Sequence, residues 1–189
     1  MNERLAPVVD ATNHNREQFE RFCRALSNDE LVRPIPESHW RVKDYIAHLA
    51  SMDIWMLEWF EAMVRGDRFI PRADDGGPFD IDAWNDARIG ERQDASVDEL
   101  LSEAATGRQK LMATFPEFSD EALTSRFNFR GRDVSFMDYL ELWTLHDPAH
   151  SLDMLKALPE KKQEPWVRGW IDEFRAESMR LVADTTARG

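Results

Sequence analysis

The amino-acid sequence predicts an all-α protein: a four-helix bundle with an additional C-terminal helix. Three observations support this fold class. Large apolar residues recur every three or four positions, alternating strand patterns are nearly absent, and serines precede two of the apolar runs at the spacing of helix N-caps. The 189 residues are enough for one substantial core, and no repeat or linker-like segment divides them. We therefore expect one domain over residues 1–189.

Two helices are expected in the first third of the chain. The first spans about residues 7–26 and ends in the polar turn SNDE. The second begins after Trp40 and continues to about Arg65, where Gly66 ends it. Large apolar side chains lie on two rows of this second helix, so we expect it to be central rather than peripheral.

A long loop and a short helical piece are expected next. Residues 66–80 are rich in Gly, Pro and Asp and have no hydrophobic period, which predicts a loop. Loops of this length often form lids or binding segments. The segment IDAWNDARIGER, residues 81–92, then has a helical pattern.

Three longer helices are expected in the second half of the chain. They span about residues 97–114, 136–157 and 164–183. Ser96 and Glu99 have the spacing of a capping box at the start of the first of these helices. Ser135 and Asp138 form a weaker variant at the start of the second, because Asp is shorter than Glu.

The charge of the chain excludes several classes of function. Its 36 acidic and 24 basic residues give a formal net charge of −12, without a dense Lys/Arg run. Such a surface repels phosphate backbones and anionic lipids, so we expect neither nucleic acid nor membrane as a partner. No apolar stretch approaches the roughly 20 residues that span a bilayer, and the first residues lack the pattern of a secretory signal. A cytoplasmic location follows as the default expectation.

The chain has one cysteine, Cys23, so an internal disulfide is excluded. Phe19, Phe22 and Leu26 share its helical stripe. We interpret Cys23 as a small buried hydrophobic residue rather than a nucleophile, because no base lies beside it in the sequence.

Three of the five histidines lie on apolar helical rows. His146 and His150 continue the row of Tyr139 and Trp143, and His48 lies on the corresponding row of the second helix. Buried imidazoles need partners for their nitrogens, and one divalent cation bound by three of them would provide these partners together. Three protein nitrogens leave a coordination position open, as in catalytic metal sites. The alternative is that each histidine is a hydrogen-bonded core residue.

Pro148 complicates this interpretation, because it lies between the two neighbouring histidines. Proline removes one backbone donor and crowds the carbonyl of Thr144, so the helix must either kink or restart. In a restart, Asp147 would be the N-cap and Pro148 the first helical residue. We expect the helix to continue with a local bend and both imidazoles to face His48.

Two segments that contain these histidines resemble the DinB-like superfamily, which includes YfiT-like proteins and the N-terminal domain of mycothiol-dependent maleylpyruvate isomerases. They are WRVKDYIAHLASMDIWML, residues 40–57, and LELWTLHDPAHSLDML, residues 140–155. The segment FDIDAWNDARIGERQDASVDELL also resembles the isomerase branch. The resemblance implies a four-helix bundle in which the positions of His48, His146 and His150 hold a divalent metal.

The sequence departs from the family pattern in two respects. Arg41 stands where the family usually has Ser or Thr, which can cap the helix that follows. The isomerases carry a further C-terminal domain, whereas this chain has one additional helix, so maleylpyruvate isomerase activity itself is doubtful.

The leading hypothesis is a metal-dependent enzyme in which a low-molecular-weight thiol attacks a small electrophile, either by S-transfer or to isomerise a double bond. In this hypothesis His48, His146 and His150 hold Zn²⁺, Ni²⁺ or a similar ion. The resemblance implies a low-molecular-weight thiol, for which mycothiol, bacillithiol or a related thiol are the candidates. Trp84, Asn85 and Arg88 are candidates for binding the thiol or an acidic substrate; alternatively, they belong to a surface helix with one buried Trp.

Two other hypotheses stay open. One is a metal-dependent hydrolase or self-protection and detoxification protein, in which water replaces the thiol. The other is a non-catalytic, stress-related bundle that binds a metal or a ligand. The sequence leaves open the substrate, the metal and the oligomeric state, including a homodimer.

Overall fold

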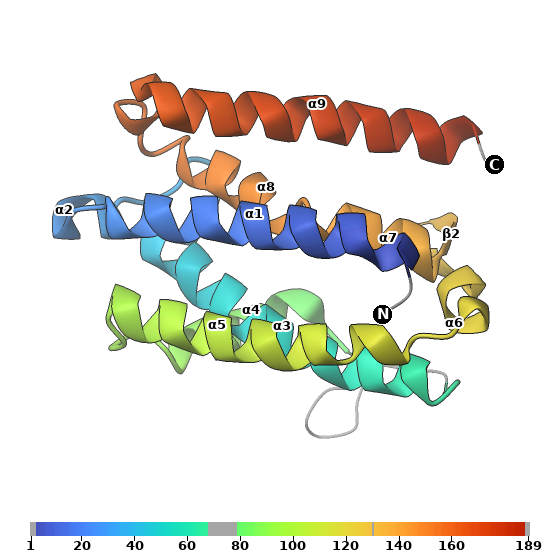
Figure 1. Ribbon diagram of the computed structural model, residues 1–189. Helices are drawn as coiled ribbons and strands as arrows, with labels where there is room; N and C mark the ends of the chain where they lie inside the picture. Colours follow the sequence, from blue (N-terminus) through green and yellow to red (C-terminus); the bar gives the residue numbers. More distant parts are fainter. Residues whose placement is uncertain (1–2, 68–78, 130, 188–189) are drawn as a thin grey trace. The chain divides into compact units, whose positions relative to one another are not determined.

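The computed structural model describes residues 3–67, 79–129 and 131–187 (Figure 1). It is mostly helical, which confirms the predicted all-α bundle class. The elements in chain order are η1 (Glu3–Leu5), α1 (Ala6–Arg24), α2 (Asn28–Leu31), α3 (Val42–Val64), α4 (Ile81–Gly90), α5 (Val97–Ala113), η2 (Phe115–Glu117), α6 (Asp120–Thr124), β1 (Arg126–Phe129), β2 (Arg132–Ser135), α7 (Phe136–Trp143), α8 (His146–Met154), η3 (Lys161–Gln163) and α9 (Pro165–Ala187). The predicted C-terminal helix is α9.

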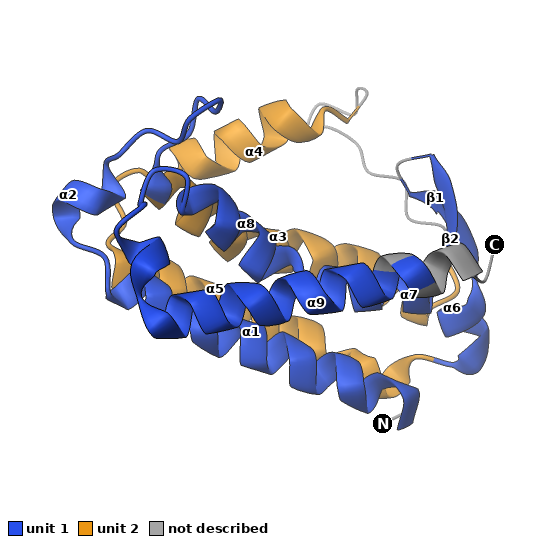
Figure 2. Ribbon diagram, turned by 90° about the horizontal axis from the view of Figure 1, so that it is seen from above, with its two compact units in different colours: residues 1–42, 119–189 blue, residues 43–118 orange. Residues whose placement is uncertain are grey.

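The chain divides into two compact units (Figure 2). Unit 1 consists of residues 1–42 and 119–189, and unit 2 of residues 43–118. The chain therefore begins in unit 1, forms unit 2 and then returns to unit 1. That both units belong to one domain stays a prediction.

Unit 1 is built around four helices. α1 contacts α7 and α8, and α9 contacts the same two helices. Large side chains from these helices are fully or almost fully buried; they include Phe19, Phe22, Phe136, Leu140, Met154, Val167 and Trp170. Burial of such aromatic and aliphatic groups is the main force that stabilises the unit.

Unit 2 contains α3, α4, α5 and η2. Both predicted rows of α3 are buried over its first half, as expected for a helix with apolar residues on more than one side. Farther along α3, Phe60 packs against Phe115 and Phe118, with ring centroids 6.0 and 5.8 Å away. These three rings form an aromatic cluster in unit 2.

The predicted capping boxes are present. The Oγ atoms of Ser96 and Ser135 accept hydrogen bonds from the backbone of Glu99 and Asp138, and both carboxylates bond back to the serine N–H groups. The bonds from the Ser96 backbone and side chain lower the pKa of Glu99. Asp is therefore long enough to complete a capping box in this chain.

The start of α3 is fixed without a side-chain acceptor at position 41. Pro34 and Arg41 form an antiparallel bridge, and the Val42 N–H donates to the Arg33 carbonyl at 3.0 Å. A backbone carbonyl thus satisfies the N–H group of the first residue of α3. At the other end, Gly66 has φ 74°, the left-handed conformation that favours glycine after a helix.

Two features of the fold differ from the sequence prediction or lie beyond it. The segment between α6 and α7 forms an antiparallel hairpin, with Phe127 opposite Val134, which the sequence pattern did not indicate. Its four-residue strands are too short to show a convincing alternation. Most of the long loop predicted for residues 66–80 lies outside the described residues.

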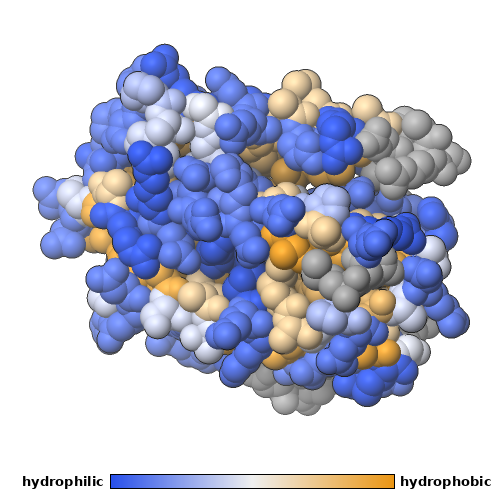
Figure 3. Space-filling view, viewed as in Figure 1, coloured by the Kyte–Doolittle hydropathy of each residue, from blue (hydrophilic) through white to orange (hydrophobic). Residues whose placement is uncertain are grey.

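The face seen in Figure 3 carries mostly hydrophilic residues, in agreement with the net charge of −12. Within the described parts of the chain, none of the helices has the length and apolar character required to cross a membrane.

Candidate metal centre

His146 and His150 converge on one side of α8. Their Nε2 atoms are 3.1 Å apart, and their ring centroids are 4.6 Å apart at an interplanar angle of 72°. Both side chains are half-buried. The predicted convergence of these two imidazoles is therefore confirmed.

The predicted continuous helix over residues 136–157 is wrong, because it is divided into α7 and α8. Thr144 and Leu145 keep helical dihedral angles, but the Leu145 N–H bonds to the Leu142 carbonyl, three residues back. The interruption thus precedes His146 and tightens the chain locally.

Pro148 lies inside α8, as its third residue. The first N–H groups of a helix have no intrahelical partner, so a proline in the first turn costs little. The restart with Asp147 as N-cap is also wrong, because Leu145 occupies the cap position and α8 begins at His146. Both histidines belong to the same helix, and this explains their convergence.

Pro148 has no backbone N–H and cannot donate a hydrogen bond to the carbonyl of Thr144. A side chain of α1 donates to this carbonyl instead. Asn15 Nδ2 donates to this carbonyl at 2.9 Å. Asn15 Oδ1 in turn accepts from Trp170 Nε1 of α9 at 3.2 Å. One amide thereby joins three helices of unit 1 at the interruption between α7 and α8.

Arg16, which follows Asn15 in α1, binds the first turn of α8. Arg16 Nε and Nη2 donate to Asp147 Oδ2 and Oδ1 at 2.7 and 3.1 Å, and both side chains are buried. The carboxylate also lies near the positive N-terminal end of α8, which favours its charge. Asn15 and Arg16 together fix the turn of helix that carries His146.

Asp153 lies behind His150 and was not identified from the sequence. Its Oδ2 is 3.4 Å from His150 Nδ1, and this contact with His150 is the largest cause of the lowered pKa of Asp153, followed in the same direction by Lys156. A carboxylate on Nδ1 leaves Nε2 as the acceptor or ligand atom, an arrangement common in metal-binding histidines. The three-residue spacing from His150 is the only feature of the sequence that could have suggested this role.

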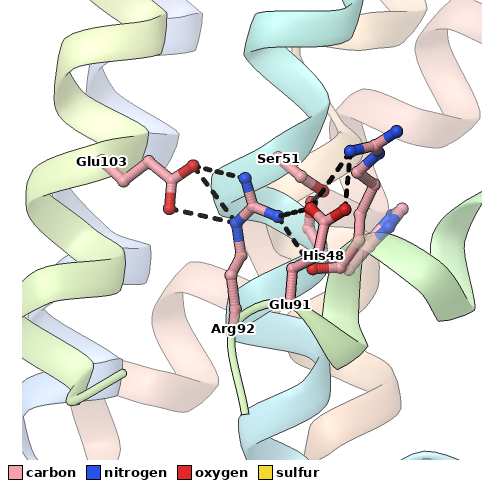
Figure 4. Close-up of polar contacts among 6 residues, drawn as sticks. His48, Ser51, Glu91, Arg92 and Glu103 are labelled. Carbon is pink, nitrogen blue, oxygen red and sulfur yellow. Dashed lines mark hydrogen bonds and ion pairs between the residues drawn. The ribbon is translucent and has the colours of Figure 1, made fainter. Parts of the chain in front are cut away.

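His48 is buried in α3 of unit 2, with 4% of its surface exposed. Ser51 Oγ donates to the His48 carbonyl at 2.8 Å; both residues are labelled in Figure 4. The predicted burial of His48 is thus confirmed. That it shares a site with the two histidines of unit 1 stays a prediction.

The histidine pair fits a divalent cation. Two nitrogens at 2.0–2.1 Å from a tetrahedral zinc ion are roughly 3.3 Å apart, close to the 3.1 Å between the two Nε2 atoms. The Asp153 carboxylate, 3.4 Å from His150 Nδ1, favours a proton on that nitrogen, away from the pair.

Trp84, Asn85 and Arg88 lie on the covered side of α4. Asn85 is buried, and Trp84 and Arg88 are half-buried. The Trp84 ring packs against Trp55, with centroids 5.9 Å apart, and the Arg88 guanidinium lies 5.5 Å from the Trp84 centroid. The structure therefore brings these residues together on one helix side, and their role in binding stays a prediction.

Ion pairs attach the C-terminal end of α4 to α5. Arg92 lies between Glu91 and Glu103 in Figure 4, with its Nε 3.0 Å from Glu103 Oε2. The hydrogen bond to Glu103 is the main reason why the pKa of Arg92 is raised. This connection holds α4, and with it Trp84 and Asn85, at a defined place in unit 2.

Cys23 is buried in α1, as expected. Burial raises the pKa of its thiol well above the ordinary value. A protonated, inaccessible sulfur is a poor nucleophile, which agrees with the interpretation of Cys23 as a core residue.

The fold and the histidine pair define an all-α bundle protein with nitrogen donors suited to a metal ion. The family model of the mycothiol maleylpyruvate isomerase N-terminal domain matches residues 13–155, and the chain belongs to this family. No curated protein matches the chain.

Two solved structures share the fold. The crystal structure of the mycothiol-dependent maleylpyruvate isomerase has a TM-score of 0.62 at 16% sequence identity, and that of its histidine-to-alanine mutant has 0.61 at 15%. Each alignment covers 79% of this chain and 60% of the other. This chain thus spans less than two thirds of the length of the proteins that it matches.

Proposed function

We propose that this protein is a metal-dependent enzyme that uses a low-molecular-weight thiol for S-transfer to, or isomerisation of, a small electrophile. The 3.1 Å approach of the His146 and His150 Nε2 atoms is the observation that carries this proposal. Membership of the isomerase N-terminal domain family supports the thiol, with mycothiol as the first candidate and bacillithiol or a related thiol as alternatives.

In this proposal His48, His146 and His150 hold Zn²⁺ or Ni²⁺ through one nitrogen each. When bound, the cation lowers the pKa of a coordinated thiol, so that the sulfur is a nucleophile at neutral pH. Three nitrogen ligands suit either ion, and the order of affinities does not determine which one is bound in the cell.

A small set of further residues in unit 1 positions His146 and His150. Asp153, 3.4 Å from His150 Nδ1, favours a proton on that nitrogen and so keeps the Nε2 lone pair available. Asp147, held by Arg16, and the Thr144 carbonyl, held by Asn15, fix the start of α8 and therefore the direction of His146. These are positioning residues, because they do not touch the reacting atoms.

We further propose that Trp84, Asn85 and Arg88 bind the thiol, that the two units form one domain, and that the protein works in the cytoplasm. A single buried cysteine and a thiol cofactor both suit a reducing compartment. The net charge of −12 makes nucleic acid an unsuitable partner.

Metal content tests the first part of the proposal. We expect about one equivalent of zinc or nickel in the purified protein by native mass spectrometry. His48→Ala, His146→Ala and His150→Ala should each reduce it strongly after dialysis. His14→Ala is the matched control, since its side chain is 52% exposed and contacts Glu173. Unchanged metal content in the variant lacking both His146 and His150 would contradict the proposal.

Turnover with and without thiol tests the second part. Maleylpyruvate is the first substrate to test, because the isomerase of similar structure is named after it. Metal-dependent turnover that requires mycothiol supports the proposal. Turnover of an electrophile without thiol would favour the hydrolase, and bound metal with no turnover would favour a non-catalytic protein.

A further inference from the structure

Resting on the metal-dependent function proposed above, we infer that Trp170 of α9 is a positioning residue for His146 and His150, and that docking of α9 thereby controls how tightly this pair binds a metal ion. Trp170 acts through the side chain of Asn15 and the carbonyl of Thr144, and not by contact with the metal. The match to the family model ends before α9 begins, so this control belongs to a part of the chain that lies outside the family domain.

The first argument is a pair of hydrogen bonds that leads from α9 to the start of α8. Trp170 Nε1 donates to Asn15 Oδ1 at 3.2 Å, and Asn15 Nδ2 donates to the Thr144 carbonyl at 2.9 Å. Thr144 lies between α7 and α8, shortly before His146. The two bonds therefore connect the indole group to the turn of the chain that carries a candidate ligand.

The second argument is the chemistry of the indole group. The Nε1–H of tryptophan can only donate, whereas an asparagine amide has a donating end and an accepting end. The indole therefore holds the oxygen of Asn15 toward α9 and leaves its nitrogen directed at the Thr144 carbonyl. If the amide turned over, its oxygen would face that carbonyl, and the carbonyl would lose its donor. Trp170 thus selects the one amide orientation that holds the interruption before α8.

The third argument is that α9 holds Trp170 in a fixed position against α1. Trp170 is 2% exposed, and its ring centroid lies 6.4 Å from that of Phe22. One turn earlier in α9, the Trp166 ring centroid lies 4.1 Å from the guanidinium carbon of Arg21. The two helices run in opposite directions (Figure 1). The indole N–H therefore reaches Asn15 only while α9 is docked.

The fourth argument is thermodynamic. The Nε2 atoms of His146 and His150 are 3.1 Å apart, and a metal ion is bound best when both nitrogens keep this approach. Docked α9 favours that geometry, and coupling between two equilibria is reciprocal, so a bound metal stabilises docked α9 by the same factor. Most described side chains of α9 are exposed or half-buried, so α9 can open locally while the rest of unit 1 stays folded. The coupling is therefore measurable from either side.

The zinc affinity of the full chain, measured by competition with a chromophoric chelator, tests the inference. Trp170→Phe keeps an aromatic ring but removes the N–H, and we expect it to weaken zinc binding about fivefold. Trp166→Phe is the matched control and should leave the affinity unchanged, because the Trp166 N–H donates to Glu164 rather than to Asn15. In an Asn15→Leu background, Trp170→Phe should have no further effect on zinc affinity, because the amide through which it acts is gone.

Hydrogen exchange measures the reciprocal effect in the wild type and so does not depend on how the variants fold. Zinc loading should slow the exchange of α9 amides about fivefold, and less in Trp170→Phe. The inference is wrong, and the proposed function stands, if Trp170→Phe and Trp166→Phe bind zinc equally well, if Trp170→Phe keeps its full effect in the Asn15→Leu background, or if bound zinc does not slow exchange in α9. If the wild type binds no zinc, the metal-dependent function and this inference are both wrong.

Discussion

Each unit of the molecule contains a buried ion pair of nearly the same geometry. In unit 1, Arg16 of α1 donates to Asp147 of α8 at 2.7 and 3.1 Å. In unit 2, Arg108 of α5 donates to Asp53 of α3 at 2.8 and 3.1 Å. Both pairs use Nε and Nη2 on the two carboxylate oxygens, and both connect a helix to the one that carries a candidate metal ligand.

The surroundings of the two pairs differ. Asp147 adjoins His146 and lies in the first turn of a helix, directly after an interruption. Asp53 lies inside continuous α3, five residues beyond His48, where α5 approaches closely at Gly107. The same type of ion pair thus holds the turn of the candidate ligand His146 in unit 1 and supports helix packing in unit 2.

The largest expected effect is from breaking either ion pair. Asp147→Ala and Asp53→Ala leave a buried arginine without its carboxylate, and each should lower the free energy of unfolding by about 3–5 kcal/mol. Urea denaturation measures this loss. Only Asp147→Ala should also lower the affinity for zinc, because only Asp147 holds the turn that contains His146.

A double substitution provides the control for this comparison. Replacing Arg16 and Asp147 together by Met and Leu removes both charges and should recover much of the lost stability. Zinc affinity should recover less, since the orientation of α8 is then fixed only by apolar contacts. Equal losses of zinc affinity in Asp147→Ala and Asp53→Ala would refute the distinction between the two units.

A second, smaller effect is expected at the interruption in unit 1. Asn15→Leu removes the donor to the Thr144 carbonyl, and we expect a loss of about 1–3 kcal/mol in the free energy of unfolding. Pro148→Ala restores a backbone N–H that can reach this carbonyl, so Asn15→Leu should cost less in that background. A double-mutant cycle measures the coupling. Additive losses would show that the amide does not compensate for the proline.

A third prediction concerns the close contact between α3 and α5 in unit 2. A Cβ atom on Gly107 would lie 3.2 Å from Ile54 Cγ1 and 3.3 Å from Asp53 Cβ. Gly107→Ala should therefore destabilise the protein by about 1–2 kcal/mol in thermal unfolding. Gly169→Ala in α9, where the described residues leave the space open to 4 Å, should instead stabilise it by about 0.5–1 kcal/mol. The opposite order would contradict the packing role assigned to the Asp53 region.

The smallest effect concerns the dependence of stability on pH. The folded-state pKa of Glu99 lies below its unfolded value, so its contribution is present above the unfolded pKa and disappears as pH falls through the folded one. Melting temperatures between about pH 6 and pH 3 should therefore fall less steeply in Ser96→Ala than in the wild type. Parallel curves would exclude a contribution from the hydrogen bond of the Ser96 hydroxyl to Glu99.

The long helices were predictable because each depends on local patterns. The start of α5 follows from Ser96 and Glu99, and the end of α3 from Gly66, both within a few residues. The inward position of His48 followed from the spacing of apolar residues in the same helix. Such features need no knowledge of the rest of the chain.

The interruption before His146 was not predictable, because a distant residue stabilises it. Pro148 indicated a strained region, but the donor to the Thr144 carbonyl comes from Asn15, 129 positions earlier. The role of Asp153 likewise depends on the ring orientation of His150, which a spacing rule does not specify. Sequence periodicity therefore identified the histidines, while long-range contacts determine how they are held.

The burial of Cys23 has a consequence for the thiol-dependent function proposed above. It is the only cysteine of the chain, it is 1% exposed, and its raised pKa keeps it protonated. An alkylating reagent can reach this sulfur only when α1 opens locally, so the labelling rate reports the opening free energy of unit 1. Under the proposed function, this sulfur would thus be protected from an electrophilic substrate for as long as unit 1 stays closed.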